Sequence, residues 1–291
     1  MLNYFSFSFK AKQKTTLSLL NCVEVILAFL RVGVSRSPGR LKMNHNSDDT
    51  YTTSLQLQRE KHLFIGGFCL SKLDIGVLAA NRSHFLHPQE NLFFETLHYP
   101  KRQQDFLIGR YCAKKAVGAL LQKNDFTQTR IENGIFQQPY VYHPSYQNLQ
   151  ITISHSDNYG AALAFSEAHP LAIDIETICI DKTKALQTQL TKAEQVLAEK
   201  LMISKISQLT VLWTIKEALS KILKCGFMVP FEILEISTMN AQDNHMISHF
   251  KNFHQYQALS FLFHNKVCSV VYPRKTDLSI DITAIQQTFK I

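Results

Sequence analysis

The stretch from Val211 to Lys224, VLWTIKEALSKILK, constrains the fold most because it forms the pattern of a single amphipathic helix. Its apolar residues recur at helical spacing and form a stripe that needs a packing partner; they are Leu212, Ile215, Leu219, Ile222 and Leu223. Trp213, Glu217 and Lys221 follow at i, i+4 and i+8, so a carboxylate and an ammonium lie one turn apart on another face. A solvated Glu/Lys pair, worth roughly 0.3 to 0.5 kcal/mol, is the alternative interpretation.

Two stretches upstream of this helix have the pattern of strands. Residues 151–155 alternate apolar and polar side chains, turn residues follow at 157–160, and 161–165 read as a second strand, which together predicts a hairpin. In the second stretch, 171–177, Asp174 and Glu176 project from one strand face, while Ile173 and Ile175 project from the other. Carboxylates that converge beside an apolar strand repel each other unless a cation intervenes, so a hard-cation site would explain the pair. Taken without other motifs, the same pattern favours an edge strand with a solvent-facing acidic side.

A further helix is expected over 101–123, where a stripe rich in small residues permits close packing. Arg110, Lys114 and Lys115 lie beside this stripe. On their own they predict a solvated basic face.

Taken in order, three motifs resemble the signature of the Sfp-type 4'-phosphopantetheinyl transferases: Ser154-His155, then I-D-I-E at 173–176, then W-T-x-K-E-A-x-x-K at 213–221. The resemblance extends from Phe106 to Lys221, and three ordered motifs are more specific than any one of them. The chain departs from the family pattern in two places. Gln137 and Gln138 precede Pro139 where a basic residue is usual, and Lys224 stands where Gly is usual.

The resemblance implies an α+β fold of two similar α/β halves related by a pseudo-twofold, with residues 57–170 as the N-terminal half and 171–291 as the C-terminal half. The residue patterns independently support only mixed α and β structure with antiparallel hairpins. Other expected elements are strands at 63–70, at 75–80 and after Gly226, helices at 88–98 and 182–202, and a hairpin over 256–272.

The activity that the resemblance implies is transfer of the 4'-phosphopantetheine arm of coenzyme A to a serine of an apo acyl, polyketide or peptidyl carrier protein, with release of 3',5'-ADP. Mg²⁺ would be held by Asp174, Glu176 and Glu217. Glu217 and Lys221 would be catalytic, with Glu217 as the general base. Contacts to coenzyme A would come from Ser154, His155, Arg110, Lys114 and Lys221.

Two other classes of function stay open. A Mg²⁺-dependent pyrophosphate-cleaving hydrolase needs the same acids but no carrier protein. A noncatalytic coenzyme A-binding module needs Ser154 and His155 but no metal-dependent turnover.

The net charge of +8 invites a nucleic-acid partner, but residues 1–42 hold seven Lys or Arg and one acid, which is +6 of the total and leaves +2 for the rest. We therefore expect no nucleic-acid partner. The apolar run 17–34 is interrupted by Asn21 and Glu24, so no stable membrane insertion is expected. Residues 1–42 are an extension that a natural start at Met43 would exclude. Six scattered cysteines without a C-x-x-C pair predict reduced thiols in the cytoplasm.

Overall fold

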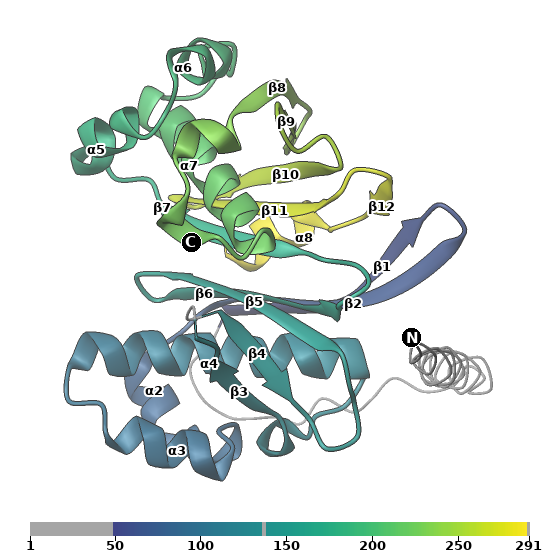
Figure 1. Ribbon diagram of the computed structural model, residues 1–291. Coiled ribbons are helices and arrows are strands. Elements are labelled where there is room, and N and C mark those ends of the chain that lie inside the picture. Colours follow the sequence, from purple (N-terminus) through teal and green to yellow (C-terminus); the bar gives the residue numbers. More distant parts are fainter. Residues whose placement is uncertain (1–48, 136–137, 290–291) are drawn as a thin grey trace, which may run out of the picture. The chain divides into compact units, whose positions relative to one another are not determined.

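The computed structural model describes residues 49–135 and 138–289 (Figure 1). The extension over 1–42, the start at Met43 and Gln137 lie outside these residues. In the described part of the chain the strands form two antiparallel sheets, so the predicted α+β class is confirmed.

The first sheet has the order β12-β1-β2-β6-β5-β4-β3. Its strands are β1 (Asp49–Arg59), β2 (His62–Lys72), β3 (Arg130–Asn133), β4 (Pro139–Tyr142), β5 (Leu149–Ser156), β6 (Tyr159–Ser166) and β12 (Thr276–Leu278). The second has the order β7-β11-β10-β9-β8. Its strands are β7 (Ala172–Thr177), β8 (Ile236–Ala241), β9 (Met246–Phe250), β10 (Tyr256–Phe263) and β11 (Lys266–Pro273). The chain thus changes sheet between β6 and β7.

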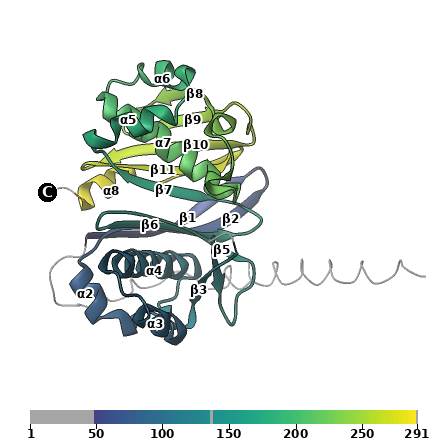
Figure 2. The ribbon, with the colours of Figure 1, turned by 60° about the vertical axis from the view of Figure 1, so that its left-hand side comes forward.

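The two sheets pack face to face, and helices cover their outer faces (Figure 2). On the first sheet lie α2 (Ile75–Ala80), α3 (Pro88–Glu95) and α4 (Pro100–Leu121). On the second lie α5 (Thr183–Thr188), α6 (Lys192–Ala198) and α7 (Lys205–Ile222), and α8 (Ile282–Thr288) closes the core between the sheets. The alternating pattern of β6 explains this layering: Leu163 faces the other sheet, whereas Ala162 and Ala164 face α4.

Small residues set how closely α4 lies on its sheet, as its sequence predicts. A Cβ atom added to Gly67 of β2 would stand 1.9 Å from the carbonyl oxygen of Ala116 in α4. The helix backbone therefore rests directly on a strand residue that has no side chain.

The edge strand β7 meets β5 of the other sheet through serine side chains rather than a backbone ladder. Ser154 Oγ accepts a hydrogen bond from Ile175 N at 3.2 Å, and Ser156 Oγ accepts one from Thr177 N at 3.0 Å. Two alternate hydroxyls of β5 thus satisfy the outward N–H groups of β7 and fix it over β5. This junction brings the Ser154-His155 motif and the Asp174-Glu176 motif together.

Two expected elements differ from the structure. The segment after Gly226, predicted as a strand, first forms short 3-10 helices at Gly226–Met228 and Phe231–Leu234, and β8 begins only at Ile236. Residues 75–80, predicted as a strand, form α2, because Asp74 caps this segment by accepting a hydrogen bond from Val77 N at 2.9 Å. The partner of β2 is instead the preceding strand β1.

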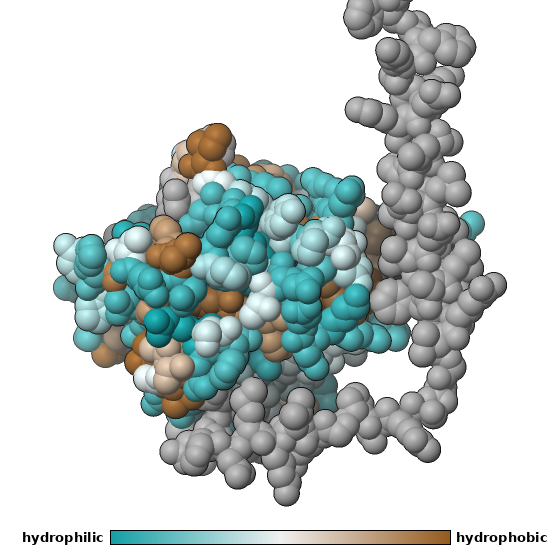
Figure 3. Space-filling view, turned by 90° about the horizontal axis from the view of Figure 1, so that it is seen from below, coloured by the Kyte–Doolittle hydropathy of each residue, from teal (hydrophilic) through white to brown (hydrophobic). Residues whose placement is uncertain are grey.

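The surface on the side from which Figure 3 is seen is mostly hydrophilic, with hydrophobic side chains in small separate groups. Among residues 49–135 and 138–289, no helix is long and apolar enough to span a bilayer.

Candidate active site

Three carboxylates converge where α7 crosses β7. Asp174 and Glu176 come from one face of β7 and Glu217 from α7, and one carboxylate oxygen of each lies within 4.8 Å of the others. Ser204 caps α7 by accepting a hydrogen bond from Ser207 N, and the buried stripe of Leu212, Ile215 and Leu219 packs this helix on the second sheet. Packing of the apolar stripe thus determines which way Glu217 projects.

The two oxygens of Asp174 differ in their partners. Its Oδ1 accepts hydrogen bonds from Ser154 Oγ and from Lys221 Nζ, each at 2.7 Å. Its Oδ2 is buried and has no hydrogen-bond partner in the described part of the chain. A buried carboxylate oxygen without a donor is costly, so this atom is suited to a cation.

The electrostatics of the three carboxylates also favour a bound cation. Burial and the neighbouring charge of Asp174 raise the pKa of Glu217 to about 8. The charge of Glu176 is partly compensated, because Lys182 Nζ donates a hydrogen bond to its Oε2 at 3.0 Å. Without a metal ion, three carboxylates at this distance cannot all be ionised at low cost.

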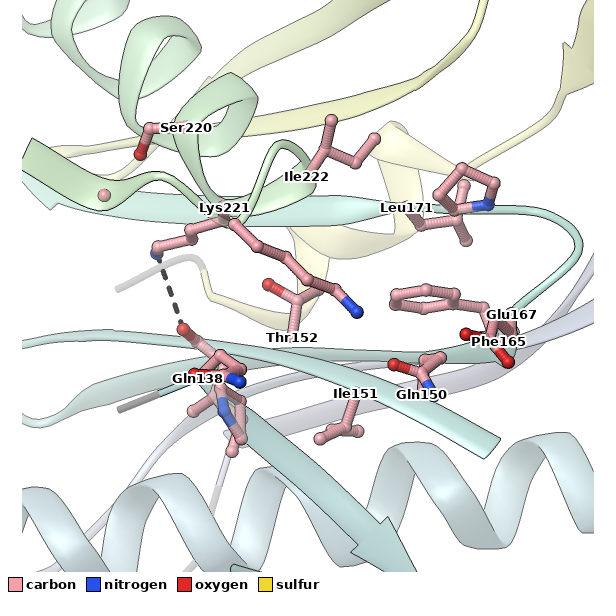
Figure 4. Close-up of a pocket in the computed structure, with 15 residues that line it drawn as sticks. Gln138, Gln150, Ile151, Thr152, Phe165, Glu167, Leu171, Ser220, Lys221 and Ile222 are labelled. Carbon is pink, nitrogen blue, oxygen red and sulfur yellow. Dashed lines mark hydrogen bonds between the residues drawn. The ribbon is translucent and has the colours of Figure 1, made fainter. Parts of the chain in front are cut away.

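Lys221 links the carboxylates to both sheets. Besides Asp174, its ammonium donates to the carbonyl oxygen of Ile173 at 3.1 Å and of Ile153 at 3.4 Å. The dashed line in Figure 4 marks the last of these contacts. Lys221 therefore lies at the β5–β7 junction with its charge next to Asp174.

A polar cavity of about 340 Å³ opens beside this group. Six of the residues predicted for the site line it, namely Arg110, Ser154, His155, Asp174, Glu217 and Lys221. Asp105 and Asn133 also line it, and the motifs did not identify them. The place of Asp105 on α4, one turn before Gly109, is the signal that would have found it.

The two basic residues predicted on α4 differ in their places. Arg110 lines the cavity, with its guanidinium 4.6 Å from the ring centre of Phe106 and its Nε 3.4 Å from Glu90. Lys114 is 1% exposed, pairs with Glu90 at 2.7 Å and donates to the carbonyl oxygens of Phe126 and Thr129. Lys114 is therefore a structural residue in this fold, not a residue of the cavity.

A second cavity, of about 310 Å³, adjoins the first at Pro139, Ile153 and Lys221, which line both. Its wall is largely apolar and includes Ile151, Phe165, Leu171 and Ile222 (Figure 4). Gln138, which stands where the family pattern has a basic residue, lines this second cavity.

Lys224, the other departure from the family pattern, has a φ of +54°. This left-handed conformation follows the C-terminus of α7 and favours glycine. The chain adopts there the backbone that a glycine would adopt.

Residues 170–271 match the model of the 4'-phosphopantetheinyl transferase superfamily. A similar solved structure is a holo-(acyl-carrier-protein) synthase from Bacillus anthracis str. Ames in complex with CoA (3',5'-ADP), with 16% identity over 38% of this chain and 96% of that chain and a TM-score of 0.31. Another is the holo-ACP-synthase from Plasmodium yoelii, with 16% identity over 40% of this chain and 95% of that chain and a TM-score of 0.29. Among curated proteins none matches.

The matched segment contains the carboxylate cluster and Lys221, so the family model and the converging side chains identify the same part of the chain. The similarity to the 4'-phosphopantetheinyl transferase superfamily thus lies in residues 170–271, about a third of the chain.

Proposed function

We propose that this protein transfers the 4'-phosphopantetheine arm of coenzyme A to a serine hydroxyl of an apo carrier protein and releases 3',5'-ADP. The observation that carries the proposal is the convergence of Asp174, Glu176 and Glu217 beside Lys221 at one polar cavity, within the segment that matches the transferase superfamily. The ordered motifs of the Sfp type support the same reaction.

The carboxylate cluster fits a divalent cation. Asp174, Glu176 and Glu217 offer three carboxylate oxygens close together. Among the described residues, the buried Oδ2 of Asp174 has no hydrogen-bond partner. Mg²⁺ prefers such oxygen ligands and commonly shares its shell with phosphates and water. When bound, it would neutralise charge on the pyrophosphate.

In the transfer, the serine oxygen of the carrier forms a bond to the phosphorus that bears pantetheine. The bond from this phosphorus to the bridging oxygen breaks, and its electron pair leaves with 3',5'-ADP. Glu217 takes the hydroxyl proton, directly or through water, a role worth roughly 10²- to 10⁴-fold in rate. The ammonium of Lys221, held at the junction, stabilises negative charge on the leaving phosphate.

Coenzyme A would be held by Arg110 and His155, which line the polar cavity from α4 and β5. The Ser154 hydroxyl, which the resemblance implies as a contact to coenzyme A, donates to Asp174 Oδ1 and accepts a hydrogen bond from Ile175 N. We assign to Ser154 the task of fixing the orientation of Asp174.

Residues 57–170 and 171–291 would be the two halves of this transferase, with 1–42 as an extension. The change of sheet between β6 and β7 supports a division near residue 170, although β12 of the second half returns to the first sheet. The cysteines among the described residues are free, which supports a cytoplasmic location.

Intact-mass analysis of apo acyl, polyketide and peptidyl carrier proteins, incubated with this protein, coenzyme A and Mg²⁺, tests the proposal. We expect one carrier class to gain the mass of one phosphopantetheine. Hydrolysis of coenzyme A without any carrier would indicate the pyrophosphate-cleaving hydrolase. Binding of coenzyme A without turnover in either assay would indicate the noncatalytic module.

A further inference from the structure

His155 of β5 lies beside a carboxylate that the motifs do not include. Its Nδ1 is 3.5 Å from Oδ1 of Asp105, which projects from α4 into the wall of the same cavity. Both side chains are partly exposed, His155 by 36% and Asp105 by 27%. They come from different elements, so their proximity depends on how α4 packs against β5.

Contacts on both sides of the Asp105–His155 pair fix the packing of α4 against β5. Gln104 Nε2 donates to the carbonyl oxygen of Asp157 at 2.9 Å, which ties the start of α4 to the turn that follows β5. One turn along, a Cβ atom on Gly109 would stand 3.3 Å from Ile153 Cγ2, so helix and strand are in close contact there. Two anchors thus flank the contact between Asp105 and His155.

Asp105 also has a second neighbour, which faces solvent. Lys101 lies one helical turn earlier with its Nζ 2.8 Å from Asp105 Oδ1, and its side chain is 63% exposed. The same oxygen is buried and has no well-oriented hydrogen bond within the described residues. The carboxylate is therefore still able to accept a better placed donor, and contacts in a free enzyme commonly shorten when the ligand binds.

The chemistry of an anionic ligand defines what this carboxylate does. A phosphate needs N–H donors, and an imidazole whose Nδ1–H is directed to a carboxylate offers Nε2–H to a ligand only when it is doubly protonated. Burial lowers the pKa of His155, and the charges of Lys101 and Lys221 lower it further, whereas Asp105 and Asp174 raise it. Asp105 thus favours the doubly protonated, charged form of His155.

We propose that Asp105 is a positioning residue for His155: its carboxylate receives Nδ1–H, orients the ring and stabilises the imidazolium that presents Nε2–H to a phosphate group in the cavity. The phosphate part of this inference rests on the proposed function, since coenzyme A and 3',5'-ADP supply that group. The contact between Asp105 and His155 does not depend on the proposed function.

Two measurements on the same variants test the inference. NMR titration of His155 in the full chain should show a lower pKa in Asp105→Asn, the parental value nearly restored in Asp105→Glu, and a higher pKa in the matched control Lys101→Ala. Calorimetric binding of 3',5'-ADP should weaken roughly tenfold or more in Asp105→Asn. In a His155→Ala background, Asp105→Asn should weaken binding no further.

An unchanged His155 titration in Asp105→Asn, or an equal loss of affinity in the His155→Ala background, overturns the positioning role. If the parent protein does not bind 3',5'-ADP, the proposed function and the phosphate part fail together. The titrations then still decide whether Asp105 controls the charge of His155.

Discussion

Lys114 of α4 and Lys216 of α7 make the same buried contact on the two sheets. Lys114 Nζ lies 2.7 Å from Glu90 Oε2, and Lys216 Nζ lies 2.9 Å from Glu194 Oε2. Each glutamate is the third residue of a short helix and completes its capping box, α3 in one case and α6 in the other. The long helix of each sheet is thus fastened to a short helix by an equivalent ion pair.

The equivalence extends to the strands. The remaining oxygen, Oε1, accepts a backbone N–H from Ile131 of β3 at 2.8 Å in one pair and from Ile236 of β8 at 3.1 Å in the other. The orders β2-β6-β5-β4-β3 and β7-β11-β10-β9-β8 also match, strand for strand along the chain. A structural repeat is therefore present where the sequence shows none.

The repeat leads to a prediction about stability. Lys114→Met and Lys216→Met should each lower the free energy of unfolding by about 3 to 5 kcal/mol, because each leaves a buried carboxylate without its cation. Urea denaturation measures the loss. As a control, Lys251→Met removes the exposed partner of Glu235 and should cost less than about 1 kcal/mol. If Lys114→Met keeps the parental free energy of unfolding but binds coenzyme A more weakly, Lys114 is a coenzyme A-binding residue rather than a structural one.

The sequence predicted the elements whose patterns are local. The amphipathic stripe of α7 and the hairpins β5–β6 and β10–β11 depend on residues that are neighbours in the chain, and all are present. Alternation in β7 also placed Asp174 and Glu176 on one face, as the cluster with Glu217 requires. Periodicity determines which side of an element a residue occupies, and this was enough to identify the carboxylates.

Long-range contacts were beyond these patterns. Arg110 and Lys114 have the same charge and lie one turn apart, and what separates their roles is Glu90, which belongs to another helix. Strands β1 and β9 were not expected, and β12 pairs with β1 across most of the chain. Asp105 reaches His155 only because α4 packs on β5.

The close approach of α4 to β2 gives a second prediction. Gly67→Ala should destabilise the fold by about 1 to 3 kcal/mol or more, since its new Cβ atom would overlap the backbone of Ala116 and push the helix away. Gly76→Ala is the matched control, because its Cβ atom would meet only the side chain of Asp74 at 3.2 Å. Thermal unfolding of the two variants compares them. Equal midpoints would show that the helix can shift at little cost.

His169 gives a pH prediction remote from the site. Burial, reinforced by the charge of Arg59, lowers the pKa of His169 to about 4, and its ring stacks on Phe64 at 4.7 Å. The unfolded chain takes up this proton near pH 6.5, so it binds more protons than the folded state between pH 6.5 and 4. Stability should therefore fall as the pH drops through this window, with His169 contributing on the order of 3 kcal/mol.

His169→Phe keeps a ring against Phe64 and should reduce the slope of unfolding free energy against pH between 6.5 and 4. His62→Phe replaces an exposed histidine whose ring lies 6.3 Å from the same phenylalanine and should keep the parental slope. Denaturant titrations at a series of pH values measure both. A parental slope in His169→Phe would assign the acid sensitivity to other groups.

The final prediction is that the three carboxylates bind Mg²⁺ as one unit. Asp174, Glu176 and Glu217 repel one another when no cation is bound, so Mg²⁺ should stabilise the folded protein by mass action. Glu217→Gln removes one carboxylate ligand and should reduce the rise in thermal midpoint that Mg²⁺ produces with coenzyme A. Glu176→Gln should do the same but also free Lys182, its partner at 3.0 Å.

Asp174→Asn should have the largest effect, because this residue is 1% exposed, has the free Oδ2, and receives hydrogen bonds from Ser154 and Lys221 on its other oxygen. Its amide should lower stability even without Mg²⁺, whereas Glu217→Gln should not, since it relieves repulsion. The control Glu235→Gln alters a carboxylate paired with Lys251 outside the cluster and should keep the parental Mg²⁺ response. If one of the three amide variants keeps the parental Mg²⁺ response in both thermal midpoint and turnover, the replaced carboxylate is not a metal ligand. The other two carboxylates would then hold the metal without it.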